Sequence, residues 1–174
     1  MPRLILPLYL LDSSDFGASL AAELGLPFAF ASHFAPDYLL YRREFKPSAA
    51  SQKPYVIIGI GLYAAESDDE ARRLFSSAQL QGLSLIRGRP GKLPPPVDNI
   101  GEQWSREEHA ALAQRTQFAA VGSPETVRHR IEEWLEQTAA DEMIAVSQIY
   151  DHAARLRSYE IGSRVFQQIN ATKR

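Results

Sequence analysis

The sequence contains no cysteine, so disulfide bonds, thiolate metal ligands and thiol catalysis are excluded. Its longest apolar runs are much shorter than the about 18 to 20 residues that a membrane helix needs. The first three residues are not followed by the apolar core that is typical of a secretory signal peptide. Lysine and arginine are scattered and the net charge is −2, so no basic patch offers a site for nucleic acid or an anionic membrane. We therefore expect a cytoplasmic protein with neither of these partners.

Histidine is scarce as well. None of the four histidines shares a metal-ligand spacing with carboxylates, so no metal site is expected. What remains is ordinary for a globular protein: 174 residues, 45% of them hydrophobic. The length predicts a single domain over residues 1–174.

Four largely continuous apolar runs are predicted to be buried strands: residues 4–11, 27–31, 55–64 and 142–149. A helical pattern follows each run, so the expected repeat is four parallel βα units. Four units are half of an eight-unit barrel, and a complete barrel usually takes about 250 residues. The chain is thus expected to be either a small open α/β sheet or half of a TIM barrel.

Local signals predict where helices begin and end. After the first strand, Phe16, Leu20 and Leu24 recur at helical spacing, and Gly25 stands at the C-terminal cap. Further helices are expected to begin near residues 36, 67, 105, 123 and 151, each marked by an N-terminal signal. In the last helix the candidate inward-facing residues are Leu156, Tyr159, Phe166 and Ile169.

The most informative stretch is Ser13-Ser14-Asp15-Phe16, where the first strand passes into its helix. A helix N-terminus offers free N–H groups and the positive end of the helix dipole, and two hydroxyls stand beside it here. The turn is therefore a candidate phosphate-binding turn, although serine also serves as a simple helix cap.

One long segment without a helix or strand pattern, residues 88–103, precedes the last strand and contains Pro90, Gly91, Pro94, Pro95 and Pro96. Such a segment inside a compact domain is typical of an active-site lid, or of a plain surface excursion. Arg87 and Arg89 beside it are candidates for gripping an anionic group, or are solvated loop arginines.

Six blocks of the sequence, in order and spacing over nearly the whole chain, resemble the C-terminal half of the bacterial-luciferase-like flavin monooxygenases. The blocks are LLDSSDF (10–16), GLPFAFASHFAP (25–36), YRREFKPS (41–48), RGRPGKLPPP (87–96), VGSPETV (121–127) and YDHAARLRSYE (150–160). The resemblance implies strands five to eight of a TIM barrel, with the long insertion as a mobile cover before the last strand. It also implies binding of FMN, often as a reduced diffusible substrate, and oxidation of an aldehyde or similar small organic compound with O2.

The resemblance carries cofactor-binding roles onto five residues. The turn after strand five contacts the flavin phosphate, which corresponds to Ser13, Ser14 and, more weakly, Gly17. The end of strand six lies near the flavin ring, which corresponds to Ser32 and His33. No catalytic residue is assigned, because the family's catalytic histidine belongs to the first four strands.

Three departures from the family pattern matter. Strands one to four have no counterpart here, Asp12 stands where close relatives usually have glycine, and the helix after residue 36 is about five residues shorter. Two functions thus remain open: a working FMN-dependent monooxygenase, expected to be a homodimer of half-barrels, or a truncated non-catalytic relative or flavin-binding fragment. A fragment of a split enzyme is a third, and the choice between FMN and a deazaflavin stays open.

Overall fold

The computed structural model describes residues 6–30 and 37–172. The chain forms two compact units. Unit 1 consists of Met1–Gly59 and Gln137–Ile144, and unit 2 of Ile60–Glu136 and Ala145–Arg174. Strand β3 and strand β5 each begin in unit 1 and end in unit 2.

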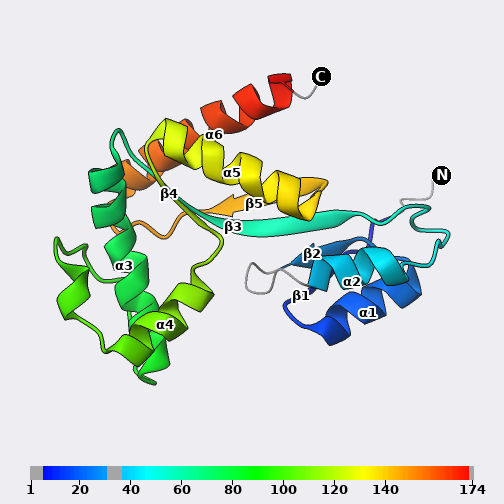
Figure 1. The fold of residues 1–174 in the computed structure, drawn as a ribbon, viewed down its shortest axis with the longest axis horizontal. Helices are drawn as coiled ribbons and strands as arrows, with labels where there is room; N and C mark the ends of the chain where they lie inside the picture. The colour runs from blue at the N-terminus through cyan, green and yellow to red at the C-terminus, as the bar shows by residue number, and fades with distance from the viewer. Residues whose placement is uncertain (1–5, 31–36, 173–174) are drawn as a thin grey trace. The chain divides into compact units, whose positions relative to one another are not determined.

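Strands and helices alternate along most of the chain (Figure 1). The strands are β1 Leu10–Asp12, β2 Phe28–Phe30, β3 Val56–Ala64, β4 Ala119–Gly122 and β5 Glu142–Val146. The α-helices are α1 Asp15–Leu24, α2 Asp37–Glu44, α3 Asp68–Ile86, α4 Arg106–Arg115, α5 Pro124–Thr138 and α6 His152–Thr172, and a short 3₁₀ helix spans Ile100–Glu102. None of the helices in the described residues is long and apolar enough to cross a membrane.

Strands β1 to β4 pair in parallel, and β5 also pairs with β3. In unit 1, Leu10 lies opposite Phe28, and Phe28 lies opposite Val56. In unit 2, the later part of β3 pairs with β4, beginning with Gly61 opposite Ala119. The expected α/β class with parallel strands is confirmed.

The strand predictions differ from the structure at three places. The buried strand predicted over residues 142–149 is β5 over Glu142–Val146 only, and Ile144 and Val146 are 50% and 51% exposed. Of the predicted strand over residues 4–11, residues 4 and 5 lie outside the described part of the chain. Among residues 6–11 only Leu10 and Leu11 lie in β1, and Leu6 and Leu8 are 73% and 68% exposed. An apolar run makes a buried strand only if neighbours cover it, and among the described strands β1 pairs with β2 alone. Strand β4 was not predicted, because only one of its four residues, Val121, is β-branched and none is aromatic.

Unit 1 packs α1 and α2 side by side, as the blue and cyan helices of Figure 1 show. The face of α1 that is buried carries only small residues, Gly17, Ala18, Ala21 and Ala22. Phe16, Leu20 and Leu24, whose spacing predicted this helix, are exposed, with Phe16 75% exposed. The spacing predicted the helix correctly but does not mark its buried side, because small residues let α1 approach its neighbours closely.

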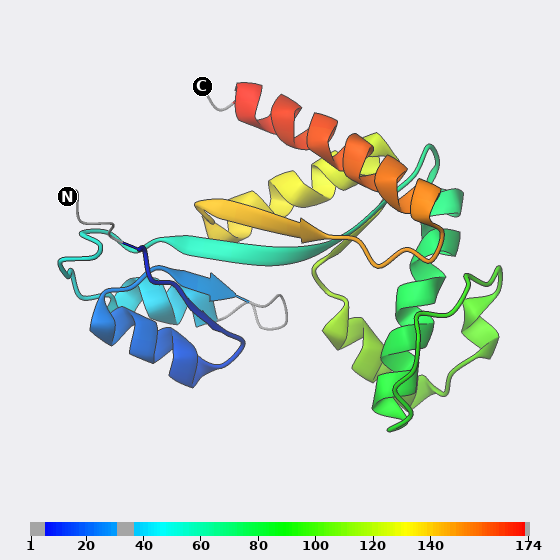
Figure 2. The ribbon, with the colours of Figure 1, turned by 180° about the vertical axis from the view of Figure 1, so that it is seen from behind.

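Unit 2 holds α3 and α4 side by side, visible in green in Figure 2. It also ties β3 to α6 through a buried serine, since the backbone N–H of Ala64 donates to Ser158 Oγ at 2.9 Å. Gly162 of α6 lies so close to Leu62 of β3 that an added Cβ would clash. Of the predicted inward face of α6, Ile169 is buried whereas Leu156 and Tyr159 are exposed, because Ser158, Ile161, Gly162 and Val165 turn inward in their place.

Candidate functional site

The predicted phosphate-binding turn lies between β1 and α1 in unit 1. Ser14 is the N-cap of α1 in extended backbone conformation, and its hydroxyl oxygen accepts a hydrogen bond from Gly17 N–H at 3.3 Å. The chain thus passes from strand to helix as the sequence predicted, and the turn brings Ser13, Ser14 and Gly17 together.

The carboxylate of Asp12 binds the groups that a phosphate would use. Its Oδ1 accepts a hydrogen bond from Ser13 N–H at 2.6 Å, and its Oδ2 accepts one from the Ser14 hydroxyl at 3.0 Å. Ser13 and Asp12 are half-buried, whereas Ser14 is exposed. The turn therefore already carries an anion, and that anion belongs to the chain itself.

The same carboxylate covers Gly17. A Cβ placed on Gly17 would lie 2.6 Å from Asp12 Cγ and closer still to Oδ2, well inside any normal contact. Glycine at this point thus makes room for the Asp12 side chain. With Asp12 in this position, the phosphate of FMN does not fit the turn, because its oxygens would need the same donors and the same space.

The other two predicted cofactor-binding residues, Ser32 and His33, lie outside the described residues. The remaining histidines, His109, His129 and His152, are exposed on helices. The ring of His109 contacts that of Trp104 in a tilted arrangement, with centroids 5.1 Å apart, and His129 Nε2 lies 3.2 Å from Glu133. His152 Nδ1 lies 2.8 Å from the guanidinium of Arg155.

An open hollow of about 550 Å³ lies in unit 1. It is lined by Phe16, Ser19, Leu20, Glu23, Glu44 and Lys46. Lys46 forms an ion pair with Glu23, and Ser19 donates a hydrogen bond to Glu44. Two carboxylates facing one ammonium leave no excess positive charge, so the hollow does not suit a phosphate either.

The long segment at residues 88–103 lies in unit 2 and is held against α3 by polar contacts. Gln81 donates to Gly91 O at 2.9 Å, and Val97 N–H donates to Ser76 Oγ at 2.8 Å. Arg73 forms an ion pair with Asp98 at 2.7 Å. The segment therefore lacks regular structure over most of its length and yet is anchored at several points along one helix.

Arg87, one candidate for gripping an anionic group, is bound to Glu108 of α4. Its Nε and Nη2 donate to the two carboxylate oxygens at 2.7 and 2.9 Å, and Nη2 also donates to Gln103 O at 2.8 Å. These bonds, with one from Ser105 N–H, lower the pKa of Glu108 to about 2 from its usual 4.5. Arg87 thus joins α3 to α4 and is not available to a ligand in this arrangement.

This ion pair should make stability depend on pH in acid. A carboxyl whose pKa is lowered by folding stabilises the fold above pH 4.5, and this contribution is lost as the pH falls toward about 2. We expect Glu108→Gln to lower the melting temperature at neutral pH and the difference from wild type to vanish near pH 2. Arg87→Gln should remove the same pH dependence, and a difference that stays constant across this range would contradict the assignment. Thermal unfolding followed by circular dichroism measures both.

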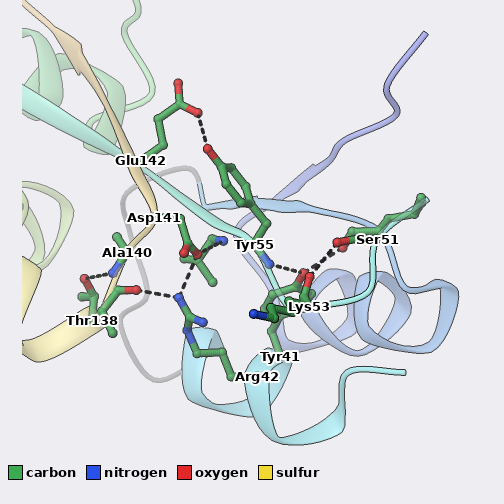
Figure 3. A network of polar contacts seen from close by, with 12 residues as sticks. Tyr41, Arg42, Ser51, Lys53, Tyr55, Thr138, Ala140, Asp141 and Glu142 are labelled. Carbon is green, nitrogen blue, oxygen red and sulfur yellow. Dashed lines mark hydrogen bonds and ion pairs between the residues drawn. The ribbon is translucent and has the colours of Figure 1, made fainter. Parts of the chain in front are cut away.

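Two further clusters of hydrogen-bonded polar residues were not predictable from the sequence, because their members are distant along the chain. In unit 2, Asp68 Oδ1 accepts Ser123 N–H at 2.7 Å at the start of α5, and this bond is the main cause that lowers the pKa of Asp68. In unit 1, Arg42 donates to Asp141 at 2.9 Å and to Ala139 O at 2.5 Å, as Figure 3 shows. Residues 55 and 99 positions apart leave no local signal in a sequence.

Beside the Arg42 pair, the buried Tyr41 hydroxyl donates to Leu26 O at 2.9 Å and accepts Tyr55 N–H at 3.1 Å (Figure 3). Burial is the main cause that raises the pKa of Tyr41. The Asp141 carboxylate also accepts Val56 N–H at 2.8 Å. These side chains satisfy backbone groups at the start of β3, so we assign the cluster a structural role.

Comparisons with known proteins agree with the residue pattern. The family model described as "Luciferase-like monooxygenase" matches residues 1–142. A "Luciferase-like monooxygenase" of Escherichia coli strain K12 is 46% identical over 169 residues, which cover 94% of this chain and 50% of that protein. The uncharacterized protein YvbT of Bacillus subtilis strain 168 is 40% identical over 166 residues, again with 49% of its length covered. The chain spans about half the length of the curated relatives it matches.

Solved structures also match most of this chain, over about half or less of their own length. The structure of apo-MsnO8 matches with a TM-score of 0.77 and 29% identity, over 95% of this chain and 53% of that one. The long-chain alkane monooxygenase LadA matches with a TM-score of 0.63 over 93% of this chain and 41% of that one. At 14% identity, the likeness to LadA concerns the fold alone.

Proposed function

Because the chain belongs to the luciferase-like monooxygenase family, we propose that it serves the oxidation of a small organic compound, such as an aldehyde, with reduced FMN as the cofactor. The observation that carries the proposal is the family match over residues 1–142, which includes the β1–α1 turn at Ser13 and Ser14. Because the chain spans about half the length of its relatives, we propose that residues 1–142 take part in the reaction, and we name none of them as catalytic.

A second candidate function is a non-catalytic relative, and one observation favours it. The Asp12 carboxylate holds Ser13 N–H and the Ser14 hydroxyl, so the flavin phosphate does not fit the turn in this arrangement. A chain that keeps the fold but closes this turn has no phosphate anchor there. Its role would then be structural or one of binding another chain.

Titration of FMN with the full chain, followed by flavin fluorescence, separates the two candidates. Saturable binding together with consumption of reduced flavin and oxidation of a long-chain aldehyde supports the monooxygenase. Binding without oxidation indicates a flavin carrier. Absence of binding at high micromolar protein overturns the flavin proposal and leaves the non-catalytic relative.

We also propose self-association, with a second copy of the chain as the partner. Strand β1 is flanked by exposed apolar side chains, among them Leu8 at 68% and Leu11 at 69% exposed, and no described strand other than β2 pairs with it. An uncovered strand edge beside apolar residues favours pairing with another chain. The half-length match to relatives supports the same idea, because two copies of the chain together have about the length of one relative.

Sedimentation velocity at micromolar concentration tests this proposal. We expect a dimer in the wild type and a shift toward monomer in Leu11→Asp, which places a charge on the exposed side of β1. Leu85→Asp, a change at a similarly exposed leucine of α3 in unit 2, is the matched control and should remain a dimer. A clean monomer of the wild-type chain would overturn the proposal.

A further inference from the structure

We infer that Asp12 is a built-in anion that replaces the cofactor phosphate in the β1–α1 turn and keeps external phosphate groups out of it. The inference rests on the proposed function only for the choice of FMN as one of two probes. It concerns a residue at which this chain departs from the glycine expected from the family resemblance.

The hydrogen bonds around Asp12 form a closed set. Ser13 N–H donates to Oδ1 at 2.6 Å and the Ser14 hydroxyl donates to Oδ2 at 3.0 Å, so each carboxylate oxygen has a partner in the turn. The Ser14 oxygen in turn accepts Gly17 N–H at 3.3 Å. A carboxylate, a hydroxyl and two backbone N–H groups thus satisfy one another. An incoming phosphate would have to break the bonds to Asp12 to gain its own.

Space and charge exclude a phosphate together with Asp12. The carboxylate lies over the Cα of Gly17, because a Cβ there would meet Asp12 Cγ at 2.6 Å. The open face that a glycine offers to an approaching anion is therefore filled. An ionised carboxylate also repels a phosphate at this distance, which lowers the affinity further.

The chain uses the same arrangement at the start of α5 in unit 2. There Ser123 N–H donates to the carboxylate of Asp68 at 2.7 Å, and Gly122 leaves no room for a Cβ because of Thr126 and Asp68. In both turns a carboxylate from the chain binds a serine N–H where a helix begins, beside a glycine whose Cβ position is filled. The recurrence shows that this sequence can complete a strand-to-helix turn with its own anion.

Titration of inorganic phosphate into the ¹⁵N-labelled full chain tests the inference, with the amide signals of Ser13, Ser14 and Gly17 as the readout. We expect no saturable shift in the wild type. In Asp12→Gly we expect a saturable shift, with an affinity for phosphate at least about tenfold higher than that of the wild type. Asp12→Asn keeps the size of the side chain and removes its charge, so it separates repulsion from occupation of space. Asp15→Asn is the matched control, since Asp15 also lies in the first turn of α1 but takes no part in these bonds.

Two outcomes would overturn the inference: a saturable shift at these amides in the wild type, or an Asp12→Gly response no greater than that of Asp15→Asn. Circular dichroism of each variant shows whether it has kept the fold. If Asp12→Gly fails to fold, Asp12→Ala, which removes both the charge and the group that lies over Gly17, decides the matter by the same criterion.

A second arm compares FMN with riboflavin, which lacks the phosphate, by flavin fluorescence. Asp12→Gly should raise the affinity for FMN and leave that for riboflavin unchanged. A wild-type chain that binds FMN at least about tenfold more tightly than riboflavin would contradict the inference. If neither flavin binds any variant while inorganic phosphate binds Asp12→Gly as expected, the proposed flavin function fails and the role of Asp12 stands.

Discussion

Replacing Gly25 with alanine should lower the free energy of unfolding by about 2 to 4 kcal/mol, because two costs combine at this residue. Gly25 caps α1 with a left-handed backbone, at φ 61° and ψ 40°, a conformation that costs an alanine about 1 to 2 kcal/mol. An alanine Cβ would also lie 2.6 Å from Ser48 Cβ and closer still to Lys46 O. The backbone of residues 46–48 would have to move away from α1.

Two other glycines separate these costs. Gly88 also has a positive φ, 67°, but no atom lies within 4 Å of its Cβ position, so Gly88→Ala should cost only the backbone part, about 1 to 2 kcal/mol. Gly91 is equally open and has no positive φ, so Gly91→Ala should stay within about 0.5 kcal/mol of the wild type. Urea denaturation followed by circular dichroism gives the three values. A Gly25→Ala cost no greater than that of Gly88→Ala would show that the contact with residues 46–48 is absent.

Tyr41→Phe is expected to cost about 2 to 4 kcal/mol, although it removes a single oxygen atom. Tyr41 is fully buried, and its hydroxyl bridges Leu26 O and Tyr55 N–H. Phenylalanine keeps the packing against Phe28, whose ring centroid lies 5.6 Å away, but leaves both backbone groups without this partner. Each buried group left unpaired costs about 1 to 3 kcal/mol.

Tyr55→Phe is the matched control. Its hydroxyl donates to Glu142 at 3.1 Å, and Glu142 is exposed, so water replaces the lost bond. The expected change is below about 0.5 kcal/mol. Similar costs for the two substitutions, measured by urea denaturation, would show that the Tyr41 hydroxyl is reached by water and that the bridge is not decisive.

The helix ends were predictable because their signals are local. Gly25 caps α1 as expected, and Ser105 forms both hydrogen bonds of a capping box with Glu108. Ser67 accepts from Glu70 N–H, in agreement with its spacing. In each case the residues that interact lie within a few positions of one another, so the pattern in the sequence already contains the contact.

Burial and long-range pairing were not predictable in the same way. The apolar spacing of α1 does not reveal that Gly17 and Ala21 are buried and that Phe16 is exposed, since the closeness of packing decides which side is buried. The bond between Asp68 and Ser123 joins residues 55 positions apart. Such contacts depend on the tertiary fold, which one sequence does not specify locally.

The candidate site has features that the sequence predicted and others that it could not predict. The sequence predicted the turn at Ser13 and Ser14 and placed a competing charge at Asp12, and the structure brings these residues together. What the sequence could not show is that both carboxylate oxygens are already bound and that the side chain lies over Gly17. Phosphate binding by Ser13, Ser14 and Gly17 remains a prediction, to be tested with the Asp12 variants.

The Asp12 carboxylate at the start of α1 has opposite effects on phosphate binding and on the stability of the helix. A negative charge at a helix N-terminus stabilises the helix by about 0.3 to 1 kcal/mol, so glycine at position 12 would make the turn more receptive and the unit less stable. Most substitutions destabilise, and one that gains stability while losing a ligand is readily kept once the ligand is no longer required. Backbone similarity is insensitive to such an exchange, since a TM-score of 0.77 to apo-MsnO8 describes the path of the chain and not which anion fills a turn.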